Sequence, residues 1–173
     1  MLFNLLGSVA VAAVTGLLLF LVRRHFWRTM PRWGLPAAAG LAMIVFSIWN
    51  SYAWYGRITD HLSEGVVVAA TYPTRSPIEP WTYAFPRVQH FVAVNMAGRT
   101  QVAGHPDIVF AEVIEFQQFK PVRRSLQIFD CRAGRMGNPP AEEPQVDAAG
   151  TIIGVDWSPS AAGAPIIATA CGT

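Results

Sequence analysis

The segments LFNLLGSVAVAAVTGLLLFLV (residues 2–22) and LPAAAGLAMIVFSIWNSYAWY (residues 35–55) decide the architecture of this chain. Neither segment contains Asp, Glu, Lys, Arg or His. At a rise of about 1.5 Å per residue, either segment as a helix reaches roughly 30 Å, the thickness of the hydrocarbon core of a bilayer. The sequence therefore predicts a two-helix transmembrane hairpin over residues 1–64, with helices at about 2–22 and 35–63. The alternative, a cleaved signal peptide before a single anchor, is disfavoured because the apolar core follows Met-Leu-Phe-Asn without a basic region.

The loop between the two segments, residues 23–34, predicts the orientation of the hairpin. It holds Arg23, Arg24, Arg28 and Arg32 and no acidic residue. By the positive-inside rule this loop stays in the cytoplasm, so the N-terminus and the chain after residue 55 lie outside. The same arginines could also attract acidic lipid head groups. Aromatic residues suited to the membrane interface flank both edges: Trp27 and Trp33 inside, and Trp49, Tyr52, Trp54 and Tyr55 outside.

Small residues recur every four positions in both segments, which allows helix backbones to approach closely in lipid. One stripe is Ser8, Ala12 and Gly16, and the other is Gly34, Ala38 and Ala42. In an antiparallel hairpin we expect Gly16 to lie level with Ala42 and Ser8 level with Trp49. Ser8 and Ala12 then remain either for a docking partner or to accommodate large side chains such as Trp49.

The charge balance argues against nucleic-acid binding. The formal net charge is +2 at pH 7, but every acidic residue lies after residue 55, where acids outnumber bases. The basic excess therefore belongs to the membrane loop and not to a folded domain, which is where a nucleic-acid site needs it. Arg is used almost to the exclusion of Lys, which is typical of a GC-rich bacterial genome. We therefore expect a bacterial inner-membrane protein with a periplasmic N-terminus and a periplasmic C-terminal domain.

Both cysteines, Cys131 and Cys171, fall in the exported part of the chain. An even number of cysteines in an oxidising compartment favours a disulfide, and the closed loop of about 40 residues stabilises the fold by roughly 3–4 kcal/mol in the chain-entropy model. The alternatives are two free thiols or a shared metal site. The spacing does not match a zinc or haem motif, and we expect no metal and no cofactor.

The remaining chain, residues 65–173, is predicted to be a small periplasmic domain rich in antiparallel β-sheet. Residues 72–86 are rich in proline and aromatic residues and favour extended chain. Residues 136–150 are polar and proline-rich and favour a mobile loop. The pattern predicts strands at 66–71, 88–94, 108–116, 121–131 and 151–157, and a short helix at 161–171 with Pro165 in its first turn.

Residues 108–116 and 121–131 have the pattern of a hairpin with its tip near Gln118. Pairing residues whose numbers sum to 236 sets Ile108 against Ile128 and Phe110 against Leu126. This register also sets Glu112 against Arg124, the charged pair on the apolar face of the predicted sheet. A structural ion pair is the favoured interpretation, and an acid–base role for Glu112 is the alternative.

Three aromatic residues, Trp81, Tyr83 and Phe85, alternate within residues 72–86. Either they cover the core of their own domain, which is the favoured prediction because exposed apolar patches are uncommon on monomers, or they face a partner or the lipid surface.

The last third of the chain carries Asp130-Cys131, a polar insert, an Asp-x-x-Gly turn at 147–150, Trp157, and a terminal segment that closes on Cys171. In these features it resembles the surface-adhesin protein E family of small exported proteobacterial proteins. The resemblance covers about 45 residues. It implies a small β-sheet domain with a bridge between Cys131 and Cys171, and no binding residue is carried over from it.

No motif in the chain identifies a reaction. His90 is interpreted as a hydrogen-bonded strand residue, and His105-Pro106-Asp107 as a turn that offers too few ligands for a metal. We expect an α+β membrane protein that acts as a non-enzymatic accessory, assembly or stabilising subunit. Its expected partners are the lipid bilayer and another membrane protein, met through the helices and the periplasmic domain. The alternatives are a membrane-anchored ligand- or envelope-binding module and, less favoured, a small periplasmic enzyme in which His90 or His105 meets Glu112 or Asp107.

Overall fold

The computed structural model describes residues 2–25, 33–102, 104–139, 145–146, 152–158 and 163–172. It divides into two compact units, Met1–Arg57 and Ile58–Thr173, called here the helical unit and the sheet unit.

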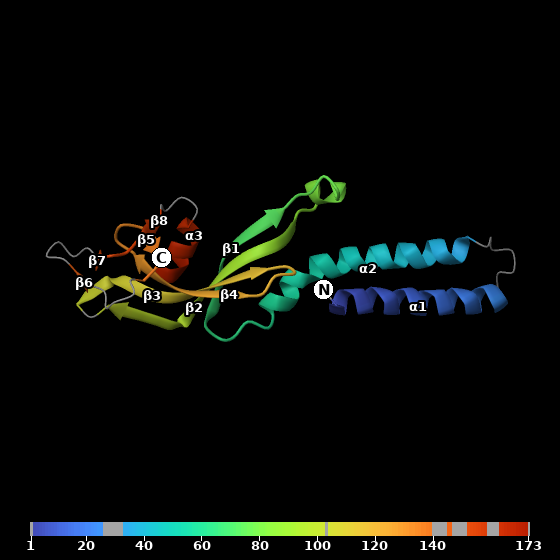
Figure 1. Ribbon diagram of the computed structural model, residues 1–173, viewed down its shortest axis with the longest axis horizontal. Helices are drawn as coiled ribbons and strands as arrows, with labels where there is room; N and C mark the ends of the chain where they lie inside the picture. The colour runs from blue at the N-terminus through green and yellow to red at the C-terminus, as the bar shows by residue number, and fades with distance from the viewer. Residues whose placement is uncertain are drawn as a thin grey trace. The chain divides into compact units, whose positions relative to one another are not determined.

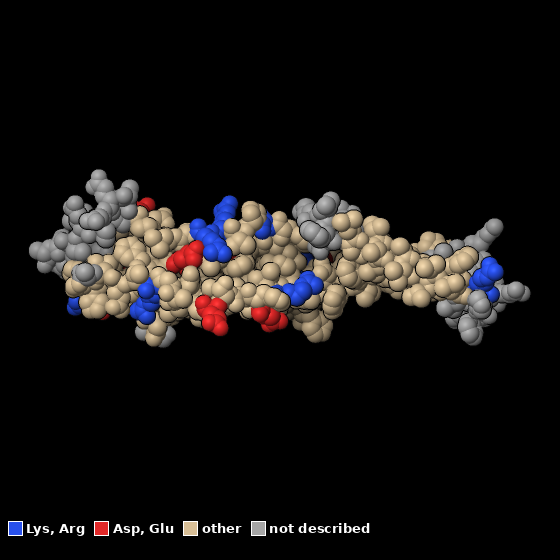
Figure 2. Space-filling model, turned by 90° about the horizontal axis from the view of Figure 1, so that it is seen from below, with Lys and Arg blue, Asp and Glu red and all other residues tan. Residues whose placement is uncertain are grey.

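The helical unit contains two antiparallel helices that lie side by side, α1 (Leu2–His25) and α2 (Gly34–Thr59) (Figure 1). By length and composition, one candidate membrane span is present, Pro36–Thr59, and the described side chains of α1 add a shorter apolar helix, Leu6–Leu21. The middle of this unit shows no acidic or basic side chain on the face seen in Figure 2.

The helix ends differ from the predicted ones. Because α1 continues to His25, Arg23 and Arg24 belong to its last turn and not to the loop, as suits a residue with good helix propensity. The loop members Arg28 and Arg32 lie outside the described residues, as does Trp27 among the interfacial aromatics. At the other end α2 stops at Thr59 instead of residue 63, since the N–H groups of His61 and Leu62 donate to the carbonyl oxygens three residues back, those of Ile58 and Thr59.

The two small-residue stripes do not lie opposite each other at the predicted heights along the hairpin, so this prediction is wrong. A Cβ at Gly7 would lie 3.4 Å from the ring of Phe46, whereas a Cβ at Gly16 would meet nothing within 4 Å. Val11, and not Gly16, shares a surface groove with Ala42. Gly7, which neither stripe includes, is the small residue that lies against the ring of Phe46.

The sheet unit is built on a six-stranded antiparallel sheet that curves into a half-barrel, with strand order β1-β2-β3-β4-β5-β8. The fold class of this unit is α+β, as predicted. Its elements are β1 (Val66–Thr74), the 3-10 helix η1 (Pro80–Tyr83), β2 (Arg87–Val102), β3 (His105–Gln117), β4 (Arg123–Asp130), β5 (Arg135–Gly137), β8 (Trp157–Ser158) and α3 (Ala164–Cys171), with a separate pair β6 (Gln145–Val146) and β7 (Ile152–Ile153).

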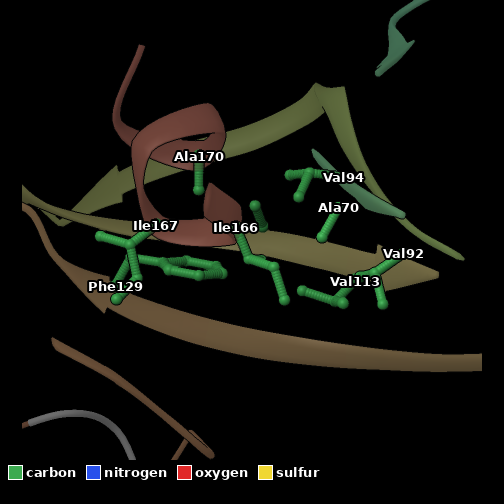
Figure 3. Close-up of a cluster of buried hydrophobic side chains, with 9 residues drawn as sticks. Ala70, Val92, Val94, Val113, Phe129, Ile166, Ile167 and Ala170 are labelled. Atoms are coloured by element: carbon green, nitrogen blue, oxygen red, sulfur yellow. The ribbon is translucent and has the colours of Figure 1, made fainter. Parts of the chain in front are cut away.

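The helix α3 covers one face of the sheet and forms the main core with it (Figure 3). Alternate residues of the long strands point toward this helix because side chains of a strand alternate between its two faces. Each fully buried Ile or Val contributes about 1.5–3 kcal/mol relative to exposure. The cluster consists of Ala70, Val92, Val94, Ala111, Val113 and Phe129 from the sheet and Ile166, Ile167 and Ala170 from α3.

The opposite face of the sheet is closed by smaller groups. Phe91 stacks on Phe116 with ring centroids 4.7 Å apart. Ile108 and Ile128 pack with Val102, Phe110, Val155 and Trp157. Both faces are therefore apolar near the middle of β2 and β3, which explains why four consecutive residues of β2, 91–94, are buried.

The predicted β3–β4 register is wrong by two residues. The structure pairs Ile108 with Asp130, Phe110 with Ile128 and Glu112 with Leu126, so paired numbers sum to 238. A shift of two keeps each side chain on its face, so the apolar pattern is satisfied equally well by both registers. The hairpin turns around Phe119, whose φ of 67° lies in the left-handed region, and this turn selects the register.

Other predicted boundaries also change. Residues 72–74 extend β1, and a 3-10 helix forms at Pro80–Tyr83, where the extended-chain prediction for 72–86 fails because Pro80 suits the first turn of a helix. Within the predicted mobile loop 136–150, Met136 and Gly137 belong to β5 and residues 145–146 form β6, while 140–144 and 147–150 lie outside the described residues. The predicted strand 151–157 is instead two short strands, β7 and β8, in different sheets. The predicted terminal helix is present as α3, with Pro165 in its first turn.

Candidate contact surfaces

The loop between β1 and β2 exposes large apolar side chains. Ile78 is 89% exposed, Phe85 70%, Tyr83 56% and Trp81 38%. The favoured prediction that Trp81, Tyr83 and Phe85 cover their own core is therefore wrong. The sequence could not show this, because the same alternation suits an inward-facing and an outward-facing segment.

Hydrogen bonds and an ion pair hold the backbone of this loop in one conformation. The buried hydroxyl of Thr82 donates a hydrogen bond to the Glu79 carbonyl oxygen over 2.7 Å and accepts one from the Ser76 N–H over 2.9 Å. Arg87 Nη2 lies 2.8 Å from Glu79 Oε2, so an ion pair ties the loop to the first residue of β2. These contacts therefore fix the turn that carries the exposed aromatic side chains.

The turn between β3 and β4 adds Phe119, 53% exposed, and Val122, 49% exposed. It lies at the same end of the sheet as the β1–β2 loop, since Thr74 pairs with Arg87 and His90 pairs with Gln117 (Figure 1). We call these exposed side chains of the two loops the apolar tip: Ile78, Trp81, Tyr83, Phe85, Phe119 and Val122. The sequence analysis did not single out Ile78, Phe119 or Val122. Their apolar side chains, next to Pro77 and in the β3–β4 turn, were the signal that could have identified them.

Glu112 and Arg124 approach each other as predicted, but diagonally and not as directly opposed residues. Arg124 Nη1 lies 3.6 Å from Glu112 Oε1, and Asn95 Nδ2 donates a hydrogen bond to Glu112 Oε2 over 3.1 Å. The Arg124 side chain is 66% exposed, so solvent screens this pair.

A pocket of about 380 Å³ opens beside this pair within the sheet unit. The segment that precedes β1 forms one wall and the sheet forms the other. The polar side chains that line it include His61, Glu64, Asn95 and Arg124, and Ile114 and Phe116 supply part of its apolar floor.

His90 meets a carboxylate other than the two that the enzyme alternative names. His90 stacks on Tyr72 with centroids 4.8 Å apart, and its Nε2 lies 2.9 Å from Glu115 Oε1, so its carboxylate neighbour is Glu115 and not Glu112. The predicted turn at His105-Pro106-Asp107 is instead the start of β3. Among the described residues, no group of three or more His, Cys, Asp or Glu side chains is placed to hold a metal ion.

The predicted bridge is present: Cys131 and Cys171 form a disulfide with Cα atoms 5.6 Å apart, joining the end of β4 to the last turn of α3. Beside it, Asp130 accepts hydrogen bonds from the backbone of Arg132 and Ala133 and from the Arg135 guanidinium over 2.8 Å. Burial alone raises the pKa of the Asp130 carboxyl, but these hydrogen bonds and the charge of Arg135 outweigh it and hold the pKa below its ordinary value of 3.8. Arg135 also lies over the Trp157 ring, 4.8 Å from its centroid.

The helical unit has an open apolar groove of about 500 Å³ between its two helices. Ala38 and Ala42 of the predicted stripe line it. Its full lining is Val11, Ala38, Leu41, Ala42, Val45, Phe46 and Trp49. Gly34, Trp33, Tyr52, Trp54 and Tyr55 do not line it, and neither do Ser8 and Ala12.

These features define the chain as an α+β protein that joins an apolar helical hairpin to a disulfide-bridged antiparallel half-barrel. Comparison with known proteins finds no matching family model, no matching curated protein and no matching solved structure.

Proposed function

We propose that the chain is a non-enzymatic accessory subunit of a bacterial inner-membrane complex. In this proposal α1 and α2 both span the membrane, the arginine-bearing loop is cytoplasmic, and the sheet unit lies in the periplasm. The long apolar α2 and the disulfide support a membrane anchor and an oxidising compartment.

The observation that carries the proposal is the apolar groove of the helical unit. Ala38 and Ala42 line this groove beside the larger Phe46 and Trp49, and small residues let a second helix approach closely in lipid. A transmembrane helix of a partner protein would fill it with close van der Waals contact. The sheet unit then supplies the contact on the periplasmic side.

The test is affinity purification of the tagged full chain from native membranes in mild detergent, with quantitative mass spectrometry. We expect one membrane protein in near-constant ratio to the chain. Filling the groove with Ala38→Leu and Ala42→Leu should remove that protein, whereas Ala10→Leu and Ala13→Leu, which change exposed α1 residues outside the groove, should retain it. Recovery of the wild-type chain alone, or only with further copies of itself, contradicts the proposal.

A second candidate, a membrane-anchored ligand-binding module, is favoured by the pocket beside Glu112 and Arg124. Its volume suits a small molecule, and His61, Glu64 and Arg124 offer both signs of charge. The Trp81, Tyr83 and Phe85 cleft expected for such a module is not this pocket, which none of the three lines. Under this candidate the wild-type chain is recovered without a protein partner, and Arg124→Gln changes the small molecules that co-purify with it.

The resemblance of residues 130–171 to the surface-adhesin protein E family remains a proposal about the sheet unit. The Cys131–Cys171 bridge that it implies is consistent with it, and no adhesin activity is proposed.

A further inference from the structure

We propose that the apolar tip docks onto the surface of an anionic lipid bilayer. This inference rests on the proposed function, because it takes α2 as a membrane span, but it assigns a surface that the helical anchor does not need.

The chemistry of the tip is that of a membrane interface. Trp and Tyr combine an apolar ring with a polar group and concentrate where the hydrocarbon meets the head groups. Trp81, Tyr83 and the purely apolar Ile78 and Phe85 are all exposed in the β1–β2 loop, and Phe119 is exposed in the β3–β4 turn. Such a group of exposed side chains exceeds what scattered surface residues explain.

The charges around the tip favour an anionic surface. Three exposed basic residues lie in or beside the two loops, Arg75, Lys120 and Arg123. Among the acids of the same loops and strand ends, Glu79 is paired with Arg87. Glu115, whose Oε1 lies 2.9 Å from His90 Nε2, adds one negative charge against these three positive ones. The net charge that flanks the tip is therefore positive, and each basic residue near an anionic head-group layer adds attraction.

The rigidity of the loop makes this contact efficient. Thr82, 1% exposed, anchors the loop through its hydroxyl, and the Arg87–Glu79 pair fixes the base. The backbone of the loop is already ordered before any contact forms, so docking has to order only the exposed side chains.

The start of the sheet unit lies near one of the two loops of the tip. Ile58, the first residue of the sheet unit, lines a pocket with Phe116 and Arg124. These two residues lie at the end of β3 and the start of β4, next to the turn that holds Phe119. The sheet unit therefore begins at the end of the sheet that carries the tip.

A protein partner is the alternative occupant, since protein interfaces are also enriched in aromatic residues and arginine. The experiment separates the two. The full chain is produced with p-benzoyl-phenylalanine in place of Phe85, reconstituted in phosphatidylcholine vesicles with or without phosphatidylglycerol, and irradiated. The control position is Thr100, which is exposed on β2 and lies roughly 40 Å along the strand from Arg87.

We expect lipid adducts at position 85, at least about fivefold above position 100, with the higher yield in vesicles that contain phosphatidylglycerol. Combining Arg75→Gln, Lys120→Gln and Arg123→Gln should lower that yield roughly tenfold, toward the value in phosphatidylcholine alone. Equal adducts at positions 85 and 100, or a yield indifferent to lipid charge and to the three substitutions, overturns the inference.

Irradiation in native membranes gives the second readout. Lipid adducts at position 85 support bilayer docking, and a single protein adduct in their place overturns it. Retention of the chain in vesicles after alkaline extraction tests the membrane span separately. A chain that is retained but gives no lipid adduct contradicts only the inference, whereas a chain that is stripped from the vesicles contradicts the span as well.

Discussion

Asp130 holds the corner at which β4 turns into β5. Its carboxylate accepts two backbone N–H groups and the Arg135 guanidinium, which in turn lies over Trp157 of β8. The side chain of Asp130, directly before Cys131 of the disulfide, thus links β4 to β5 and, through Arg135, to β8.

Asp130→Asn removes the charged acceptor and should lower the free energy of unfolding by about 1–3 kcal/mol at neutral pH. Because the folded pKa is depressed, the wild-type advantage is fully present above the ordinary value of 3.8 and is lost as the pH falls below it. Denaturant unfolding at neutral pH and below pH 3.8 should show the two chains converging in acid. Asp107→Asn, at an exposed carboxylate on β3, is the matched control, and a similar loss of stability in both variants would contradict the role of the corner.

The strands show how far the sequence alone predicts the fold. Periodicity located the cores of β1, β2, β3 and β4 and the face to which their side chains point, because apolar alternation is a local signal. It could not choose between β3–β4 registers two residues apart, since both bury the same side chains. The turn that selects the register has its positive φ at Phe119 and not at a glycine or an asparagine, so no turn motif in the sequence predicts it.

Some features of the candidate surfaces could be predicted from the sequence and others could not. The disulfide was predictable from two cysteines in an exported segment, and the approach of Glu112 and Arg124 from their shared face. The exposure of Trp81, Tyr83 and Phe85 was not predictable from the sequence. It depends on the Thr82 hydroxyl and the Glu79–Arg87 pair, which close the loop through contacts that form only in the folded chain.

Gly65 determines how the chain enters β1. Its φ is 85°, and a Cβ there would lie 2.7 Å from Ala97 Cβ, whereas Gly104 has a φ of 80° and open space around it. Both Gly→Ala changes introduce backbone strain of about 1–2 kcal/mol, and Gly65→Ala should cost about 1–3 kcal/mol more because Ala97 has to move. Thermal unfolding of the two variants checks this. Equal losses would show that close approach to β2 does not matter at this joint.

The disulfide holds α3 on the sheet. Its closed loop spans a sequence separation of 40, so replacing both cysteines with serine should lower stability by about 3–4 kcal/mol. Unfolding followed with and without reductant should show the wild-type chain falling to the level of the double variant, while the variant is insensitive to reductant. A wild-type chain indifferent to reduction would mean that the Ile166 and Ile167 contacts alone hold the helix.

At the scale of the whole molecule, the arginines between the helices and the disulfide beyond them require opposite environments. In the proposed topology the positive-inside rule keeps the four arginines between the two apolar segments in the cytoplasm, whereas the disulfide needs an oxidising compartment. Two membrane crossings satisfy both conditions, since they return the chain to the side on which it began. A single crossing by α2 also exports the sheet unit, but it leaves the segment before α2, α1 included, in the cytoplasm.

Reporter fusions distinguish these arrangements. When fused after the C-terminus, alkaline phosphatase should be active and green fluorescent protein should not fluoresce. The same result is expected when either reporter is joined before α1 through an added membrane-spanning helix that carries it to the periplasmic side. A fusion inserted between α1 and α2 should show the reverse, because that loop stays in the cytoplasm. Replacing Arg23, Arg24, Arg28 and Arg32 with glutamine should mix the two orientations, since the loop would lose the charge that retains it. A fluorescent C-terminal fusion in the wild-type chain would contradict the periplasmic sheet unit, and the docking of its tip on the outer surface would then be excluded as well.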